Sequence, residues 1–114
     1  MSTAFTVNST TSRGPWLVVD GYSPDVSATA VALLAAATGH EHLVKSISIN
    51  YGKTDKWIKV LDGSDLQIGP FLCSTKHWEK TFEDGLTFNG GVYIETEADS
   101  VTHVMVEYKV VPEI

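Results

Sequence analysis

Residues 85–111 read GLTFNGGVYIETEADSVTHVMVEYKVV, and this stretch decides the fold that we expect. Apolar and polar side chains alternate over residues 92–96 and again over residues 102–110. Successive side chains of a strand point to opposite faces, so the pattern predicts two strands, each with one buried and one solvated face. The link at residues 97–100 is short and polar, which is typical of a hairpin loop.

The hairpin has a preferred register. If residue 96 pairs with residue 102, the aliphatic side chains of both strands share the inner face, and a slip by one residue would expose them. On the outer face this register sets Tyr93 opposite Met105 and Glu95 opposite His103. Tyrosine and methionine are enriched at protein interfaces. Tyr93 and Met105 are therefore candidate interface residues.

Turn signals divide the rest of the chain into further short strands. We expect strands at residues 43–51, 57–61, 66–72, 77–82 and 86–88, and Gly69-Pro70 places the third of these at a sheet edge. Residues 26–37, VSATAVALLAAA, fit a strand over residues 29–36 or a short helix. The spacing predicts an all-β domain at residues 26–114, a single antiparallel β-sandwich or jelly-roll-like barrel of about seven to eight strands.

Residues 1–25 are rich in Ser and Thr and contain Pro15 and Pro24, which disfavour a continuous helix. We expect an extended N-terminal arm. Its apolar patch, Trp16, Leu17 and Val18, fits two interpretations. It forms an edge strand against its own domain, or it docks on a neighbouring subunit.

Composition limits the possible partners. The net charge of −6, with eight scattered basic residues, argues against nucleic-acid binding. The longest apolar run, at residues 30–37, is too short to span a bilayer, and the first residues do not resemble a secretion signal. The single cysteine, Cys73, excludes an internal disulfide and is compatible with a reducing cytoplasm.

Two groups of residues invite a chemical interpretation. His40-Glu41-His42 has the spacing of a metal site on one strand face, although polar residues after a turn are ordinarily solvated. Cys73 has His77 four residues away, but its apolar neighbours favour a buried structural cysteine over a nucleophile. No phosphate-binding, dinucleotide-binding or nucleophile-elbow motif occurs. We therefore expect no catalytic residue, no cofactor and no metal.

Residues 35–109 resemble small β-sandwich proteins encoded among the structural genes of tailed bacteriophages. The resemblance rests on turns and core positions: Gly39 before a strand, Asp62-Gly63 after a strand, the Ile-Gly-Pro step at residues 68–70, Gly85-Leu86, and the closing strands at residues 92–108. It covers about two thirds of the chain and leaves out residues 1–25.

The resemblance implies a non-enzymatic virion protein made in the host cytoplasm, most plausibly a capsid decoration (cement) protein on the capsid exterior. Such proteins bind the major capsid protein and are often homotrimers, and they bind neither nucleic acid nor membrane. Trp16, Leu17 and Val18 are then candidates for arm contacts, with Tyr93 and Met105 for contacts between subunits. The alternative is a tail- or fibre-associated module that binds a host glycan or receptor.

Overall fold

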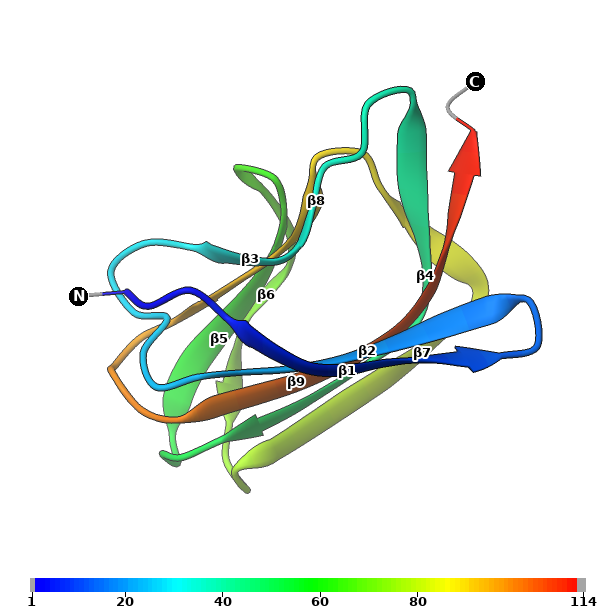
Figure 1. Cartoon of the computed structure of the whole chain (residues 1–114). Coiled ribbons are helices and arrows are strands. Elements are labelled where there is room, and N and C mark those ends of the chain that lie inside the picture. Colours follow the sequence, from blue (N-terminus) through cyan, green and yellow to red (C-terminus); the bar gives the residue numbers. More distant parts are fainter. Residues whose placement is uncertain (1, 113–114) are drawn as a thin grey trace.

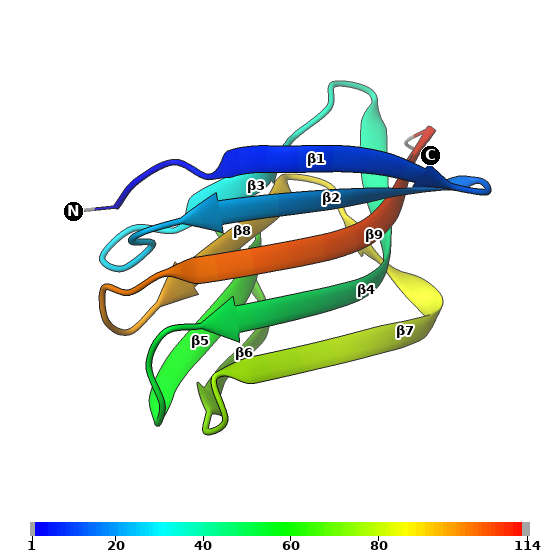
Figure 2. The same cartoon turned by 60° about the horizontal axis from the view of Figure 1, so that its bottom comes forward.

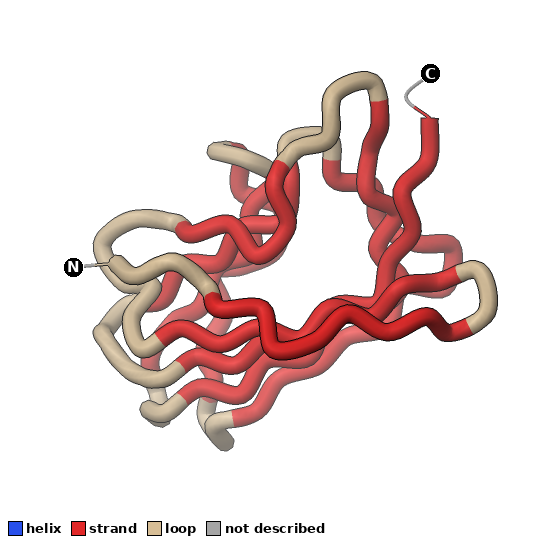
Figure 3. Tube along the Cα trace, viewed as in Figure 1, coloured by secondary structure: helices blue, strands red, loops and turns tan. Residues whose placement is uncertain are grey.

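The computed structural model describes residues 2–112, which form two antiparallel sheets packed face to face (Figure 1). The strands are β1 (Thr6–Arg13), β2 (Trp16–Ser23), β3 (Val31–Ala35), β4 (His40–Tyr51), β5 (Lys56–Asp62), β6 (Asp65–Cys73), β7 (His77–Phe88), β8 (Gly91–Thr96) and β9 (Thr102–Pro112). Strands and loops account for all of residues 2–112 (Figure 3). The described part of the chain contains no helix that could cross a membrane. The predicted all-β sandwich is confirmed.

The strand order is that of a jelly roll. One sheet runs β1-β2-β9-β4-β7, seen face-on in Figure 2, and the other runs β3-β8-β5-β6. From β2 onward the strands pair as nested hairpins, with β2 on β9, β3 on β8, β4 on β7 and β5 on β6. This is the double Greek key of an eight-stranded jelly roll, and β1 is added at one edge.

The core lies between the two sheets, and the strands from β2 to β9 contribute apolar side chains to it. Val92 and Ile94 of β8 and Val104 and Val106 of β9 are completely buried. The inner faces predicted for these two strands are therefore correct. Other fully buried side chains come from both sheets: Val44, Ile47, Ile49, Ile58, Val60 and Phe88.

The predicted hairpin between the two closing strands is wrong. β8 pairs with β3 and β5, whereas β9 pairs with β2 and β4, so the two strands belong to different sheets. Their inner faces meet across the core instead of lying side by side. Alternation reports which face of a strand is buried. It does not tell whether another strand lies beside it in the same sheet or across the core in the facing sheet, because both arrangements bury the same face.

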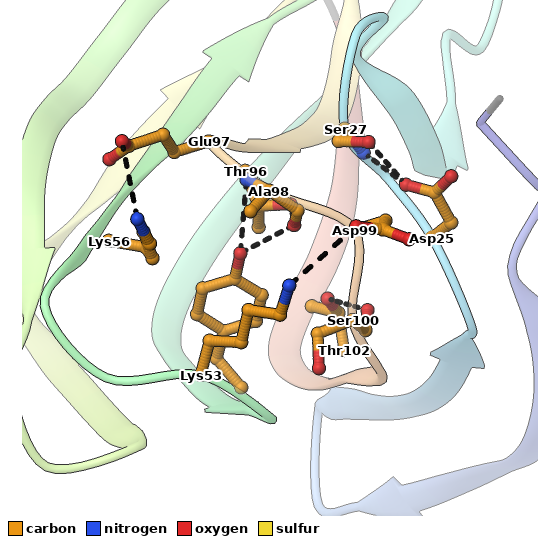
Figure 4. A network of polar contacts seen from close by, with 11 residues as sticks. Asp25, Ser27, Lys53, Lys56, Thr96, Glu97, Ala98, Asp99, Ser100 and Thr102 are labelled. Carbon is orange, nitrogen blue, oxygen red and sulfur yellow. Dashed lines mark hydrogen bonds and ion pairs between the residues drawn. The ribbon is translucent and has the colours of Figure 1, made fainter.

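The link between β8 and β9 is held in place as an inter-sheet crossing (Figure 4). The Tyr51 hydroxyl donates to the Ala98 carbonyl at 2.5 Å and accepts from the Ala98 N–H at 3.2 Å. Lys53 Nζ lies 3.7 Å from Asp99 Oδ1. Contacts from β4 and the turn after it therefore fix a loop that local sequence alone presents as a simple turn.

The N-terminal residues form a β-hairpin at one edge of the five-stranded sheet (Figures 1 and 2). β2 pairs with β9 over seven residue pairs, so the segment predicted as an arm is integrated into the sheet from β2 onward. Of the predicted ranges 1–25 and 26–114, residues 1 and 113–114 lie outside the described chain. For residues 26–37 the strand interpretation is confirmed, because Val31–Ala35 is β3.

β7 is one long strand where the sequence predicts two. Val44 pairs with Leu86 and Ser46 pairs with Thr81, so residues 82–85 bulge out opposite Lys45. Gly85 adopts φ +82° in this bulge. The predicted turn at residues 83–85 is therefore a bulge inside a strand, and β4 carries a matching irregularity at Lys45.

Candidate binding surfaces

Trp16 lies at the start of β2, on the outer face of the five-stranded sheet. Its ring is half-buried beneath two ammonium groups, with Lys109 Nζ 4.9 Å and Lys45 Nζ 5.3 Å from the ring centroid. The bulge in β4 places Lys45 opposite residues 82–85 of β7, while Lys109 comes from the middle strand, β9. Cation–π attraction holds both lysines over the indole.

Glu107 lies on the same outer face and is nearly buried, at 8% exposure. Its Oε1 is 3.7 Å from Arg13 Nη1, while its Oε2 is buried and bonds no group of residues 2–112. We call Arg13, Trp16, Lys45, Glu107 and Lys109 the Trp16 cluster. Its three cations and one carboxylate make a locally positive region on a chain of net charge −6.

Leu17 and Val18 both pack within their own domain. Leu17 points inward, half-buried against the core, and Val18 is 9% exposed on the outer face opposite Glu107. Each therefore contributes to the stability of its own domain. Of the three predicted arm residues, Trp16 is half-buried and is not packed against the core cluster.

Tyr93 and Met105 do not meet. Tyr93 lies on the outer face of the four-stranded sheet, opposite Leu61, whereas Met105 is 43% exposed on the outer face of the other sheet, opposite Asp20. The predicted pairing of the two is therefore wrong, for the same reason as the predicted hairpin. The predicted pairing of Glu95 with His103 is wrong for the same reason.

A second outer-face contact involves His103. Its Nε2 contacts Oδ1 of Asp20 on β2, and neither atom reaches solvent. His77 is also on the outer face, 2.8 Å from Asn50 Oδ1 and 3.8 Å from Glu79 Oε2. Both histidines therefore connect neighbouring strands.

The histidines of the HEH motif are far from equivalent. His40 is exposed, and its Nδ1 lies 3.1 Å from the Thr38 carbonyl oxygen. His42 is buried at 4% exposure, and its ring stands 5.5 Å from that of Tyr108. In residues 2–112 no three His, Cys, Asp or Glu side chains are grouped to hold a metal ion.

Cys73 is 1% exposed at the end of β6, and burial raises the pKa of its thiol. A raised pKa keeps sulfur in the protonated, weakly nucleophilic form. The structure thus places Cys73 in the core cluster, as the structural interpretation of the sequence predicts.

The sheet edges differ in how they are protected. β3 is five residues long and irregular, β6 contains Pro70, and β7 bulges at residues 82–85, which include Glu83 and Asp84. β1 has eight residues, all exposed on both faces, and Arg13 is its single charged residue. Natural proteins ordinarily protect edge strands with charge, proline, bulges or short length. Apart from the irregularity at Asn8, β1 is the least protected edge of residues 2–112.

The sequence predictions missed β1, the lysines of the Trp16 cluster and a hollow beside Tyr93. β1 had a local signal, because TVNSTTSR is rich in β-branched Thr and Val. The lysines had no local sequence signal, because strand pairing between distant parts of the chain brings Lys45 and Lys109 to Trp16.

Comparison with known proteins identifies no relative: the chain matches no protein-family model, no curated protein and no solved structure.

Proposed function

We propose that this chain is a non-enzymatic assembly protein, a capsid decoration (cement) protein that binds the major capsid protein on the outside of a bacteriophage head. The phage assignment rests on the sequence resemblance. The structural observation that supports an assembly role is the open edge of β1. The expected homotrimer stays a prediction.

The β1 edge suits strand addition. Its outward N–H and C=O groups form no ladder, because β2 occupies only one side of the strand. All eight residues are exposed, so β1 buries less side-chain surface within its own domain than the inner strands do. A partner strand that pairs with β1 would supply main-chain hydrogen bonds and specificity through alternate side chains.

The Trp16 cluster extends this surface. Arg13 ends β1 and Trp16 begins β2, so the cluster lies beside the turn of the same hairpin. Its three cations favour an acidic segment of the partner. Tryptophan and arginine are the residues that most often dominate binding energy at interfaces. We therefore assign the partner an extended strand with an acidic end.

Strand addition suits a cement protein on energetic grounds. A single edge contact is small compared with a standard interface, which buries about 1,600 Å². A shell carries many copies of each site, and copies that connect neighbouring subunits act together. Weak individual contacts then stabilise the assembled shell without holding free subunits together.

Two single substitutions test the edge. Successive N–H groups of a strand point to opposite sides. Of Thr10→Pro and Thr11→Pro, one variant therefore loses a hydrogen bond to β2, and the other loses an N–H donor on the open side of β1. The variant with the smaller loss in melting temperature is the one that keeps its bond to β2 and lacks the outward donor. We expect this variant to lose binding to heads built from the major capsid protein of the same genome. Co-sedimentation with those heads measures the loss.

Ser74→Pro in the exposed loop after β6 is a control for the introduction of proline. Wild-type head binding by both β1 variants would overturn the assignment of the edge. Failure of the unmodified chain to bind the heads would overturn the decoration function itself.

A further inference from the structure

A shallow hollow opens on the outer face of the four-stranded sheet, beside the turn between β5 and β6. Its volume is about 320 Å³, and it is lined by Thr29, Ala30, Gly63, Ser64 and Tyr93. Small-ligand pockets range from about 300 to 1,000 Å³. The hollow is thus at the small end of that range, and it lies on a different sheet from β1.

Hydrogen bonds fix the backbone on both sides of the hollow. On one side the Ser2 hydroxyl accepts a bond from the Thr29 N–H at 3.2 Å. On the other side the Gly63 N–H donates to the Gly91 carbonyl at 3.1 Å, and the Asp62 carboxylate accepts from the Gly90 N–H. A rigid site loses little conformational entropy when a ligand binds.

The residues that line the hollow carry one aromatic ring and three hydroxyl groups. Tyr93 is half-buried, so part of its ring remains accessible. The side-chain hydroxyls of Thr29, Ser64 and Tyr93 form no hydrogen bond with any group of residues 2–112. Hydroxyls both donate and accept, and an aromatic face packs against C–H groups.

We propose that this hollow binds a hexopyranose ring of a glycan, with the apolar face of the sugar against Tyr93. A pyranose has one face of C–H groups and a rim of hydroxyls. The ring of Tyr93 can pack against the C–H face of the sugar, and the hydroxyls of Thr29 and Ser64 can bond to the sugar hydroxyls. Thr29 and Ser64 are exposed, so water solvates their hydroxyls in the free protein. Sugar hydroxyls can replace those hydrogen bonds and an apolar side chain cannot, and therefore a sugar fits the hollow better.

Charge restricts the class of sugar. Glu95 lies on the same strand face as Tyr93, and exposed Asp65 follows Ser64 in the chain. Lys59, paired with Glu95, is the one basic residue at the neighbouring positions of β5, residues 58–62. With a net charge of −6, the chain repels acidic sugars. The site therefore selects neutral hexoses and N-acetylhexosamines.

Amide NMR spectra of the full-length, nitrogen-labelled protein test this site. The probes are the methyl glycosides of glucose, galactose, mannose and N-acetylglucosamine, with methyl glucuronide as the acidic comparison. At least one neutral glycoside should shift the amides of residues 29–30, 63–64 and 93, with millimolar affinity. The glucuronide should bind more weakly than methyl glucoside.

Variants separate the site from general effects. Tyr93→Ala should weaken binding roughly tenfold or more through loss of the ring, while Tyr93→Phe keeps most of it. Ser64→Ala removes one exposed hydroxyl without endangering the fold. Met105→Ala, on the opposite outer face, is the matched control and should bind as the unmodified chain does.

Three results would overturn the proposal. They are the absence of shifts with every neutral glycoside, shifts that persist unchanged in Tyr93→Ala, and tighter binding of the glucuronide than of methyl glucoside. Head binding through β1 is measured separately, so the two proposals fail independently.

Discussion

His42 shows at the scale of one residue how burial becomes a pH dependence. Its Nδ1 is buried and has no hydrogen-bond partner in the described part of the chain. Burial lowers the pKa of His42 from its usual 6.5, and the negative charge of Asp62 opposes this as the smaller influence. The folded protein therefore holds His42 in the neutral form at a pH where the unfolded chain already takes up a proton.

The folded protein should lose stability as the pH falls from 6.5 towards the lowered pKa of His42, because below 6.5 the unfolded state binds more protons. The loss approaches about 1.4 kcal/mol per pH unit for one proton. His42→Leu should remove this component. Urea unfolding at about pH 7.5 and about pH 5.5 measures it. An equal loss in His42→Leu and the unmodified chain would show that other groups are responsible.

At the scale of elements, the alternation of side chains predicts more about strands than about their neighbours. Residues 92–96 and 102–110 are strands with the predicted inner faces, because a period of two is local information. Their partners are not local. Tyr51, more than forty positions earlier in the chain, holds the link between them, and nothing in residues 97–100 reports that contact.

The same limit applies to the candidate sites. Trp16 and Tyr93 could be named as interface candidates from their residue type, and Tyr93 also from its outward strand face, and their role in an interface stays a prediction. The residues beside them were not, because Thr29, Ser64 and Tyr93 line one hollow only after three separate segments fold together. The open edge of β1 was hidden because a polar Ser/Thr stretch is equally typical of an irregular arm.

The bulge in β7 gives a prediction for one element. A Cβ on Gly85 would lie 2.6 Å from Leu43 Cδ1, in addition to the strain of a side chain at φ +82°. Gly85→Ala should therefore destabilise the protein by about 2–3 kcal/mol, from strain plus displacement of Leu43. Gly14→Ala, at φ +61° with no atom within 4 Å, carries the strain alone and should cost about 1 kcal/mol. Equal melting temperatures for the two variants would contradict a role for Leu43.

At the scale of the whole molecule, the two sheets separate the two proposed binding regions. β1 belongs to the edge of the five-stranded sheet, and the hollow beside Tyr93 lies on the outer face of the other. β1 shares no ladder with any strand of the sheet that carries the hollow. A partner strand that pairs with the outward edge of β1 therefore extends the five-stranded sheet and takes no ladder position beside Tyr93.

This separation predicts how the variants behave on decorated heads. Tyr93→Ala should decorate heads normally but remove their adhesion to a surface coated with the glycoside that binds best, because only the sugar contact is lost. The proline variant that blocks β1 should bind the free glycoside normally yet leave the heads bare. Surface plasmon resonance of heads over the glycoside surface measures the first result, and amide NMR with co-sedimentation measures the second. Loss of sugar binding in the β1 variant, at an unchanged melting temperature, would mean that the two regions are coupled through the core.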